Sequence, residues 1–165
     1  MPHWRLNLSD HVTGSDTSAN VLQYTWLFLV SNRRIYQKIT AELDEAFPDP
    51  TSPLDFNTLA ELPYLNAVIN EGLRLGTPLS GLPRVVPPEG FFVEGSFIPG
   101  GTVTSVPNFT QQLDPRNFSP NPEAFIPERW LDGFKDPNGR ADENAIMSFS
   151  FGSLVVHCDT RCSSS

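Results

Sequence analysis

The chain has 165 residues, of which 39% are apolar and 18% charged, and these values predict one folded domain rather than a disordered segment. It carries 19 acidic residues against 11 Lys and Arg, a net charge of −8 that argues against a nucleic-acid partner, because such binding depends on neutralising phosphates. The N-terminal MPHWRLNLSD lacks the apolar stretch of a signal peptide, and the most apolar run, Trp26 to Val30, is too short to span a membrane. We therefore expect no span, anchor or signal in this chain, and a cytoplasmic location for the chain alone.

The first predicted helix runs from Val12 to Val30. Its apolar side chains recur near helical spacing, at Val12, Ala19, Leu22, Trp26 and Val30. Within it lies TGSDTS, a weak helix-forming stretch that contains a glycine and five residues whose side chains compete for backbone hydrogen bonds.

Two cleaner helices are predicted next. One runs from Arg33 to Phe47, where a proline stops it, and its inner stripe consists of Ile35, Ile39 and Leu43. The other opens at Pro63, an acceptable first-turn position, and runs to about Leu75. Its predicted buried face consists of Leu65, Val68, Ile69, Gly72 and Leu73.

The hydrophobic period changes in the second half. FFVEGSFIPGGTVTSV predicts two short strands around Glu94 and Gly95, followed by a glycine turn and a further strand in TVTSV. DPRNFSPNPEAFIPERW is spaced by prolines but carries Phe118, Phe125 and Trp130, so we expect an ordered coil packed on the body rather than a flexible linker. The predicted fold class is mainly α with small β-sheets (α+β).

The stretch TGSDT has two interpretations. In the first, Ser15 or Asp16 caps the start of a helix. In the second, the helix begins earlier and passes through, so that Gly14 leaves a groove on one face and Thr17 bonds back to a carbonyl one turn earlier. Asp16 and Thr17 would then stand beside the groove as an acid and an alcohol, an arrangement suited to delivering protons to a small bound oxygen species.

The sequence EGLR places Glu71 and Arg74 three residues apart, on one face of the third predicted helix. An exposed pair of this kind contributes about 0.2–1 kcal/mol. Because the neighbouring faces are apolar, the alternative is a partly buried pair, which needs further partners. Arg129 in PERW is a candidate second guanidinium.

The C-terminal FSFGSLVVHCDTRC has three interpretations. It predicts either an ordinary Phe-rich strand ending in a turn, or a glycine loop that holds a cysteine sulfur at a metal. His157, Cys158 and Cys162 would supply three zinc ligands, one fewer than a closed structural site needs. Free thiols are favoured over zinc.

The order of these pieces is more specific than any one of them. Together they resemble the C-terminal part of a cytochrome P-450, a haem-thiolate monooxygenase, and the proline-rich stretches are similar to those of fungal microsomal members. The matching stretches are GSDTS, EGLR, FFVEGSFIPGGTVTSVP, DPRNFSPNPEAFIPERW and FSFG. The resemblance implies that residues 1–152 are the C-terminal portion of a cytochrome P-450 domain, from the distal helix to the start of the haem loop. Residues 153–165 form a non-matching tail.

The resemblance also implies roles for the matching residues. Gly14 falls at the oxygen groove of the distal helix, and Asp16 and Thr17 match the acid–alcohol pair that relays protons during O–O cleavage. Glu71 and Arg74 match the ExxR pair of the family.

Three further positions complete the matching set. Arg129 matches the arginine that completes the structural network of the ExxR pair. Arg84, in LPRV, falls where the family often places an arginine against a haem propionate. Phe149 and Gly152 match the start of the haem loop, where the aromatic residue packs beside the ligand cysteine.

The haem loop departs from the family pattern Phe-x-x-Gly-x-Arg-x-Cys-x-Gly. Counting from Phe149 puts Leu154 at the arginine, Val156 at the ligand cysteine and Cys158 at the last glycine. Valine has no lone pair for iron, and Cys158 lies two residues late as a metal ligand, where the loop would have to be rebuilt around it. We expect weak or no haem binding and no turnover from this chain alone.

For the intact family the resemblance implies haem b (iron protoporphyrin IX), a small organic substrate, an NADPH-dependent reductase as partner and, for microsomal types, the endoplasmic reticulum membrane. The reaction inserts one oxygen atom from dioxygen into the substrate. The alternative is a catalytically inactive, non-enzymatic or misfolded product, with exposed apolar faces on its first and third predicted helices. The abrupt change at Ser153 is typical of an unspliced intron or a shifted frame, with a genuine short protein as the other possibility.

Overall fold

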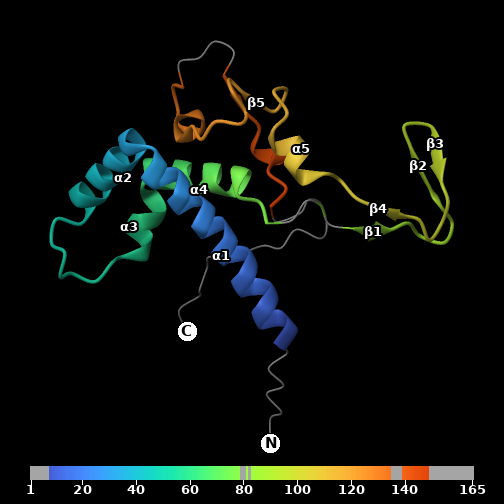
Figure 1. The fold of residues 1–165 in the computed structure, drawn as a ribbon, viewed down its shortest axis with the longest axis horizontal. Helices are drawn as coiled ribbons and strands as arrows, with labels where there is room; N and C mark the ends of the chain where they lie inside the picture. The colour runs from blue at the N-terminus through green and yellow to red at the C-terminus, as the bar shows by residue number, and fades with distance from the viewer. Residues whose placement is uncertain (1–7, 79–80, 82, 135–138, 149–165) are drawn as a thin grey trace, which may run out of the picture.

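The computed structural model describes residues 8–78, 81, 83–134 and 139–148, with side chains from residue 15 onward. Two helices, α1 (Leu8–Ser31) and α4 (Pro63–Leu75), cross at its centre, with α2 (Arg33–Ala46) and the short α3 (Phe56–Glu61) beside them (Figure 1). These are the helices expected from the hydrophobic spacing, apart from α3, which the sequence analysis missed.

The remaining elements are short. Three two-stranded antiparallel sheets pair β1 (Arg84–Val85) with β4 (Val103–Thr104), β2 (Phe91–Val93) with β3 (Ser96–Ile98), and β5 (Phe118–Ser119) with β6 (Arg140–Ala141). Between them lie the helix α5 (Asn108–Gln112) and the 3-10 turns η1 (Pro127–Trp130) and η2 (Glu143–Ala145). The predicted class, mainly helical with small sheets, is confirmed.

The β2–β3 hairpin turns at Glu94 and Gly95, as predicted. Both residues have positive φ angles, 48° and 81°, which a tight two-residue turn between antiparallel strands requires. The hairpin projects away from the helices (Figure 1), and the rings of Phe92 and Phe97 pack on each other across its strands, with centroids 5.0 Å apart. It is a separate arm rather than part of the core.

The apolar core lies where α1, α2 and α4 meet. Its buried members are Leu29, Ile35, Ile39, Tyr64, Val68 and Phe125. Ile35 and Ile39 are buried as the predicted stripe of α2 requires, and Phe125 brings the proline-spaced segment onto the body, stacked on Phe28 at 4.7 Å. The prediction that this segment is a packed coil is therefore confirmed.

The predicted buried face of α4 needs a correction. Val68 and Gly72 are buried, but Ile69 is 44% exposed. The face that turns inward carries Glu71 and Arg74 instead, because polar groups elsewhere in the chain are placed to bind them. Apolar spacing alone could not identify a face whose most buried members are charged.

TGSDTS lies inside α1, which begins at Leu8, so the interpretation of Ser15 or Asp16 as an N-cap is wrong. Thr25 behaves in the way expected of a helical threonine, since its hydroxyl donates to the carbonyl of Val21 at 2.8 Å. Where α1 crosses α4, Thr25 faces Gly72, and a Cβ added at Gly72 would lie 3.2 Å from the Thr25 Cβ. Gly72 therefore permits the close crossing.

Two carboxylates that the sequence analysis did not single out bind the free backbone N–H groups at helix starts. Asp55 accepts hydrogen bonds from the backbone N–H groups of Asn57 and Thr58 at the start of α3, and from the Thr58 hydroxyl at 2.6 Å. The bond from the Thr58 hydroxyl, followed by those from the N–H groups, lowers the pKa of the Asp55 carboxyl. At the start of α4, the cap position Leu62 has no side chain that can bond. Glu42 of α2 supplies the missing acceptors, with its two oxygens each 2.8 Å from the N–H groups of Tyr64 and Leu65.

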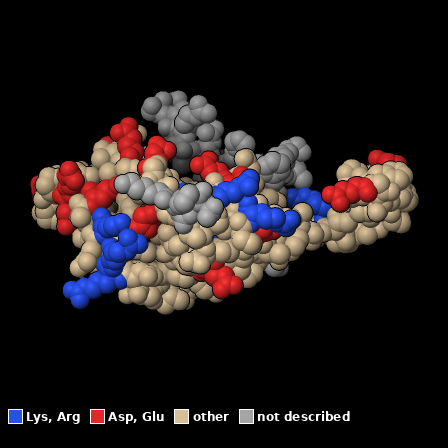
Figure 2. All heavy atoms as spheres, turned by 90° about the horizontal axis from the view of Figure 1, so that it is seen from above, with Lys and Arg blue, Asp and Glu red and all other residues tan. Residues whose placement is uncertain are grey.

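No helix in the described part of the chain combines the length and apolar character that crossing a membrane requires. Figure 2 shows basic and acidic side chains interspersed over one face, with wide uncharged areas between them. This distribution offers no single basic surface on that face, in keeping with the net charge of −8.

Candidate functional site

The candidate site is built around a fully buried ion pair, Glu71 and Arg74 on α4. Both side chains are fully buried, and the guanidinium binds the carboxylate through two parallel bonds, from Nε to Oε2 at 2.9 Å and from Nη2 to Oε1 at 2.7 Å. This bidentate geometry is the strongest form of such a pair. The exposed alternative for EGLR is wrong.

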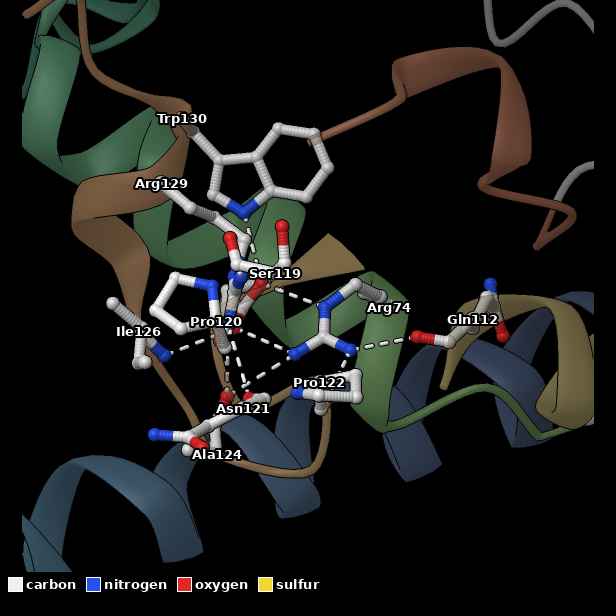
Figure 3. A network of polar contacts seen from close by, with 11 residues as sticks. Arg74, Gln112, Ser119, Pro120, Asn121, Pro122, Ala124, Ile126, Arg129 and Trp130 are labelled. Atoms are coloured by element: carbon white, nitrogen blue, oxygen red, sulfur yellow. Dashed lines mark hydrogen bonds and ion pairs between the residues drawn. The ribbon is translucent and has the colours of Figure 1, made fainter. Parts of the chain in front are cut away.

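Glu71 binds three more donors, all from one stretch of the proline-spaced segment. Its Oε1 accepts from Arg129 Nε at 3.1 Å and from the backbone N–H of Ile126 at 2.9 Å. Its Oε2 accepts from the indole N–H of Trp130 at 2.9 Å (Figure 3). The carboxylate thus receives five hydrogen bonds, which is the satisfaction that a buried charge needs.

The two guanidinium groups carry one positive charge more than Glu71 balances, and backbone carbonyls accept their remaining hydrogens. Arg74 donates to the carbonyls of Gln112 at 2.7 Å and of Ala124 at 3.1 Å, and also to that of Pro122. Arg129 donates to the carbonyls of Ser119, Pro120, Asn121 and Ala124, at 3.2 to 3.4 Å. The network therefore ties residues 112–130 to α4 (Figure 3).

Burial and charge act in opposite directions on Arg129. Burial lowers the pKa of its guanidinium, and this effect exceeds the opposing attraction of Glu71. The ring of Phe118, fully buried, covers the guanidinium of Arg74 at 5.0 Å. The site is thus a buried, preorganised polar centre that can hold backbone geometry.

Glu128, next to Arg129, binds basic residues of α2. Its Oε1 lies 2.7 Å from Lys38 Nζ and 3.1 Å from Arg34 Nη2, and it accepts the hydroxyl of Tyr64 at 3.3 Å. Burial alone would raise the pKa of the Glu128 carboxyl, but the hydrogen bond from Lys38 and the two cationic charges hold the pKa below its usual value. Burial beside this carboxylate raises the pKa of Tyr64.

A second candidate region lies around β1 and β4. A cavity of about 510 Å³ is lined there by Arg84, Val86, Phe91, Val93, Ile98, Thr104, Ser105, Val106, Asn108 and Met147. Its wall is mostly apolar, and among the described residues that line it the exposed Arg84 is the one cationic side chain. An apolar wall with a single guanidinium is suited to a ligand with an apolar body and a carboxylate.

Three of the remaining predicted site residues lie in the described part of the chain. Gly14, Asp16 and Thr17 lie in α1, where Asp16 is exposed and Thr17 half-buried, and none of them lines the cavity. Phe149 and Gly152 lie outside the described residues, as do Leu154, Val156 and the three expected zinc ligands, His157, Cys158 and Cys162. Within the described ranges no group of three His, Cys, Asp or Glu could hold a metal ion.

Sequence reasoning missed Trp130, Gln112 and Ile126 as parts of the network. The indole of Trp130 directly follows Arg129, and a buried indole usually donates a hydrogen bond, so PERW contained a usable signal. The contributions of Gln112 and Ile126 are main-chain groups, which their side-chain identities do not reveal.

The chain is similar in sequence to known proteins. The cytochrome P450 family pattern matches residues 11–154. The chain is 38% identical over 141 residues to cytochrome P450 monooxygenase astJ of Aspergillus oryzae, 34% over 143 residues to aneF of Aspergillus aculeatus, and 42% over 142 residues to ABA2 of Pyricularia oryzae. These matches cover 84%, 86% and 84% of this chain, which spans 28%, 28% and 34% of the relatives' lengths. The chain belongs to the cytochrome P450 family.

Proposed function

We propose that this chain serves a haem-dependent monooxygenase, which inserts one oxygen atom from dioxygen into a small organic substrate with electrons from NADPH passed through a reductase. The observation that carries the proposal is the buried network of Glu71, Arg74 and Arg129, formed at the EGLR and PERW sequences that resemble the family's structural motif. The printed names of the three relatives, each a cytochrome P450 monooxygenase, support it.

The residues of this chain fit haem b only in part. Arg84 beside an apolar cavity has the charge and surroundings suited to a porphyrin carboxylate. The metal-ligand position does not fit, because the sequence register puts Val156 where a cysteine would have to supply the sulfur, and the described residues hold no cluster that could replace it. We therefore propose that this chain contributes the structural core and the helix that bears Asp16 and Thr17, and that it does not ligate haem through a thiolate.

The test places this chain in a complete monooxygenase. Residues 11–158 would replace the matching segment of ABA2 of Pyricularia oryzae, and the reduced, carbon monoxide-bound protein would be examined for a thiolate-type spectrum. We expect none from the unchanged graft. A second graft carrying Leu154→Arg, Val156→Cys and Cys158→Gly should recover the spectrum and substrate oxidation.

Two results would contradict the proposal. A thiolate-type spectrum from the unchanged graft, abolished by Cys158→Ser, would make Cys158 the ligand in spite of its register. A second graft that melts cooperatively but never binds haem would instead remove haem chemistry from this segment. The Glu71→Gln version of the second graft is the matched control for the network, and it should lose both haem binding and the cooperative melt.

One observation favours the non-enzymatic alternative. The apolar side chains on the outer side of α1 are exposed, with Leu22 at 60%, Trp26 at 58% and Val30 at 67%. Exposed apolar patches mark interaction surfaces or aggregation sites. Binding of an apolar dye together with concentration-dependent association of the chain would favour this alternative, whereas a monomer that melts cooperatively and binds no dye would exclude it.

A further inference from the structure

Helix α5 attaches the last described residues of the chain to α4. The side-chain amide of Gln112 donates to Ser148 Oγ at 3.3 Å, and Ser148 Oγ donates in turn to the carbonyl of Leu73 at 2.9 Å. One turn earlier on α5, the amide of Asn108 donates to the carbonyl of Met147 at 3.4 Å. Gln112 and Asn108 are 0% and 3% exposed.

This attachment is continuous with the buried ion pair. The carbonyl of Gln112 accepts a 2.7 Å hydrogen bond from Arg74. Leu73, whose carbonyl accepts the hydrogen bond from Ser148, directly precedes Arg74 on α4. Gln112 is therefore held by its main chain to the network while its side chain holds Ser148. The residue that follows Ser148 is Phe149, the first residue of the FSFG motif.

Stability alone does not explain the amide of Gln112. Its Oε1 is buried and has no hydrogen-bond partner in the described structure. A buried acceptor without a partner lowers stability, which an apolar side chain of the same shape would avoid. The amide N–H group of Gln112 provides the hydrogen bond that Ser148 Oγ accepts, which an apolar side chain could not provide.

We propose that Gln112 is a positioning residue: through Ser148 it fixes, relative to α4, the point at which the chain enters the loop beginning at Phe149. The inference rests on the proposed function, because it gives that loop its importance, but its evidence is the contacts at Gln112 and Ser148. A segment that follows a residue bound to a rigid ion-pair network loses less conformational entropy when it adopts one conformation.

The test measures cleavage by chymotrypsin at Phe149 and Phe151 in the full chain under native conditions, with the melting temperature as a second readout. Gln112→Met keeps the volume but removes the donor together with the unpartnered oxygen. We expect it to accelerate cleavage at these two sites roughly threefold to tenfold, the loss of one hydrogen bond, with little change in melting temperature. Ser148→Ala should have the same effect, and Ser148→Thr, which keeps the hydroxyl, should restore slow cleavage.

Gln111→Met, at the exposed neighbour on α5, is the matched control and should leave cleavage unchanged. Unaltered cleavage in Gln112→Met would overturn the inference. So would a large fall in its melting temperature with cleavage throughout the chain, because that result would make the amide a general stabilising group. Neither outcome depends on haem, so a failure of the inference is distinct from a failure of the monooxygenase proposal.

Discussion

The two helices that cross at the centre of the molecule distribute their side chains in opposite ways. On α4 the fully buried side chains include the charged Glu71 and Arg74, whereas on α1 the large apolar Leu22 and Trp26 are more than half exposed. The difference shows that partners decide burial here more than the polarity of the side chain does. The charges of α4 have every donor and acceptor they need, whereas no described residue covers the outer side of α1.

Removing the carboxylate charge of α4 should have the largest effect. Glu71→Gln leaves two buried guanidinium groups without their counter-ion, and we expect it to lower the free energy of unfolding by about 3–5 kcal/mol, enough to abolish a cooperative transition in a marginal domain. Chemical denaturation followed by circular dichroism would measure it. Glu61→Gln, at an exposed position, should change little, and equal effects of the two substitutions would show that the network contributes nothing.

A matched pair of leucines tests the two sides of α1. Leu29→Ala, in the buried core, should lower the free energy of unfolding by about 2–5 kcal/mol, because it leaves a cavity. Leu22→Ala on the outer side should stay within about 0.5 kcal/mol. Denaturation midpoints of the two variants measure the difference. If Leu22→Ala were as destabilising as Leu29→Ala, the outer side of α1 would be covered in solution.

The crossing itself can be tested at Gly72. Gly72→Ala introduces a methyl group against the hydroxyl of Thr25, and we expect this overpacking to lower the free energy of unfolding by about 1–3 kcal/mol. Adding Thr25→Ala should recover most of the loss, while Thr25→Ala alone removes only one hydrogen bond within α1. Independent, additive effects would mean that the two helices do not cross at this pair.

The smallest expected effect concerns Glu128, which lies next to Arg129 and binds Lys38 and Arg34 of α2. Because the pKa of Glu128 is lower in the folded chain than its ordinary value of 4.5, the carboxylate adds stability above about pH 4.5, and this stability is lost as the pH falls through the folded-state pKa. Lys38→Met removes the closest cation and should make stability less dependent on pH in this acidic range. Thermal melts of both chains from pH 3 to 7 would measure it, and parallel curves would contradict it.

The sequence was sufficient to predict the elements whose signals are local. The spacing of Ile35 and Ile39 predicted α2, Pro63 marked the start of α4, and Glu94-Gly95 marked the hairpin turn. The short helix α3 was missed although Asp55 provided a cap signal, because six residues are too few to show a hydrophobic period.

The parts that could not be predicted depend on distant contacts. The spacing of EGLR allowed a pair of Glu71 and Arg74, but only the carbonyls and the indole brought by residues 112–130 determine that it is buried. The side of α4 that turns inward follows from the same contacts, which is why Ile69 was assigned to the wrong face. A local sequence pattern does not show which backbone groups, from residues about 50 positions further along the chain, will contact it in the fold.

The separation in sequence of the network's members has a consequence for synthesis of the chain. The Glu71 carboxylate accepts hydrogen bonds from Ile126, Arg129 and Trp130, which lie 55, 58 and 59 residues further along the chain. As the chain is made from its N-terminus, α4 leaves the ribosome long before these donors, with only its own arginine to bind the carboxylate. The buried polar network therefore forms late in synthesis. Until then the face of α4 that carries Glu71 and Arg74 is more stable exposed to water than buried without its partners.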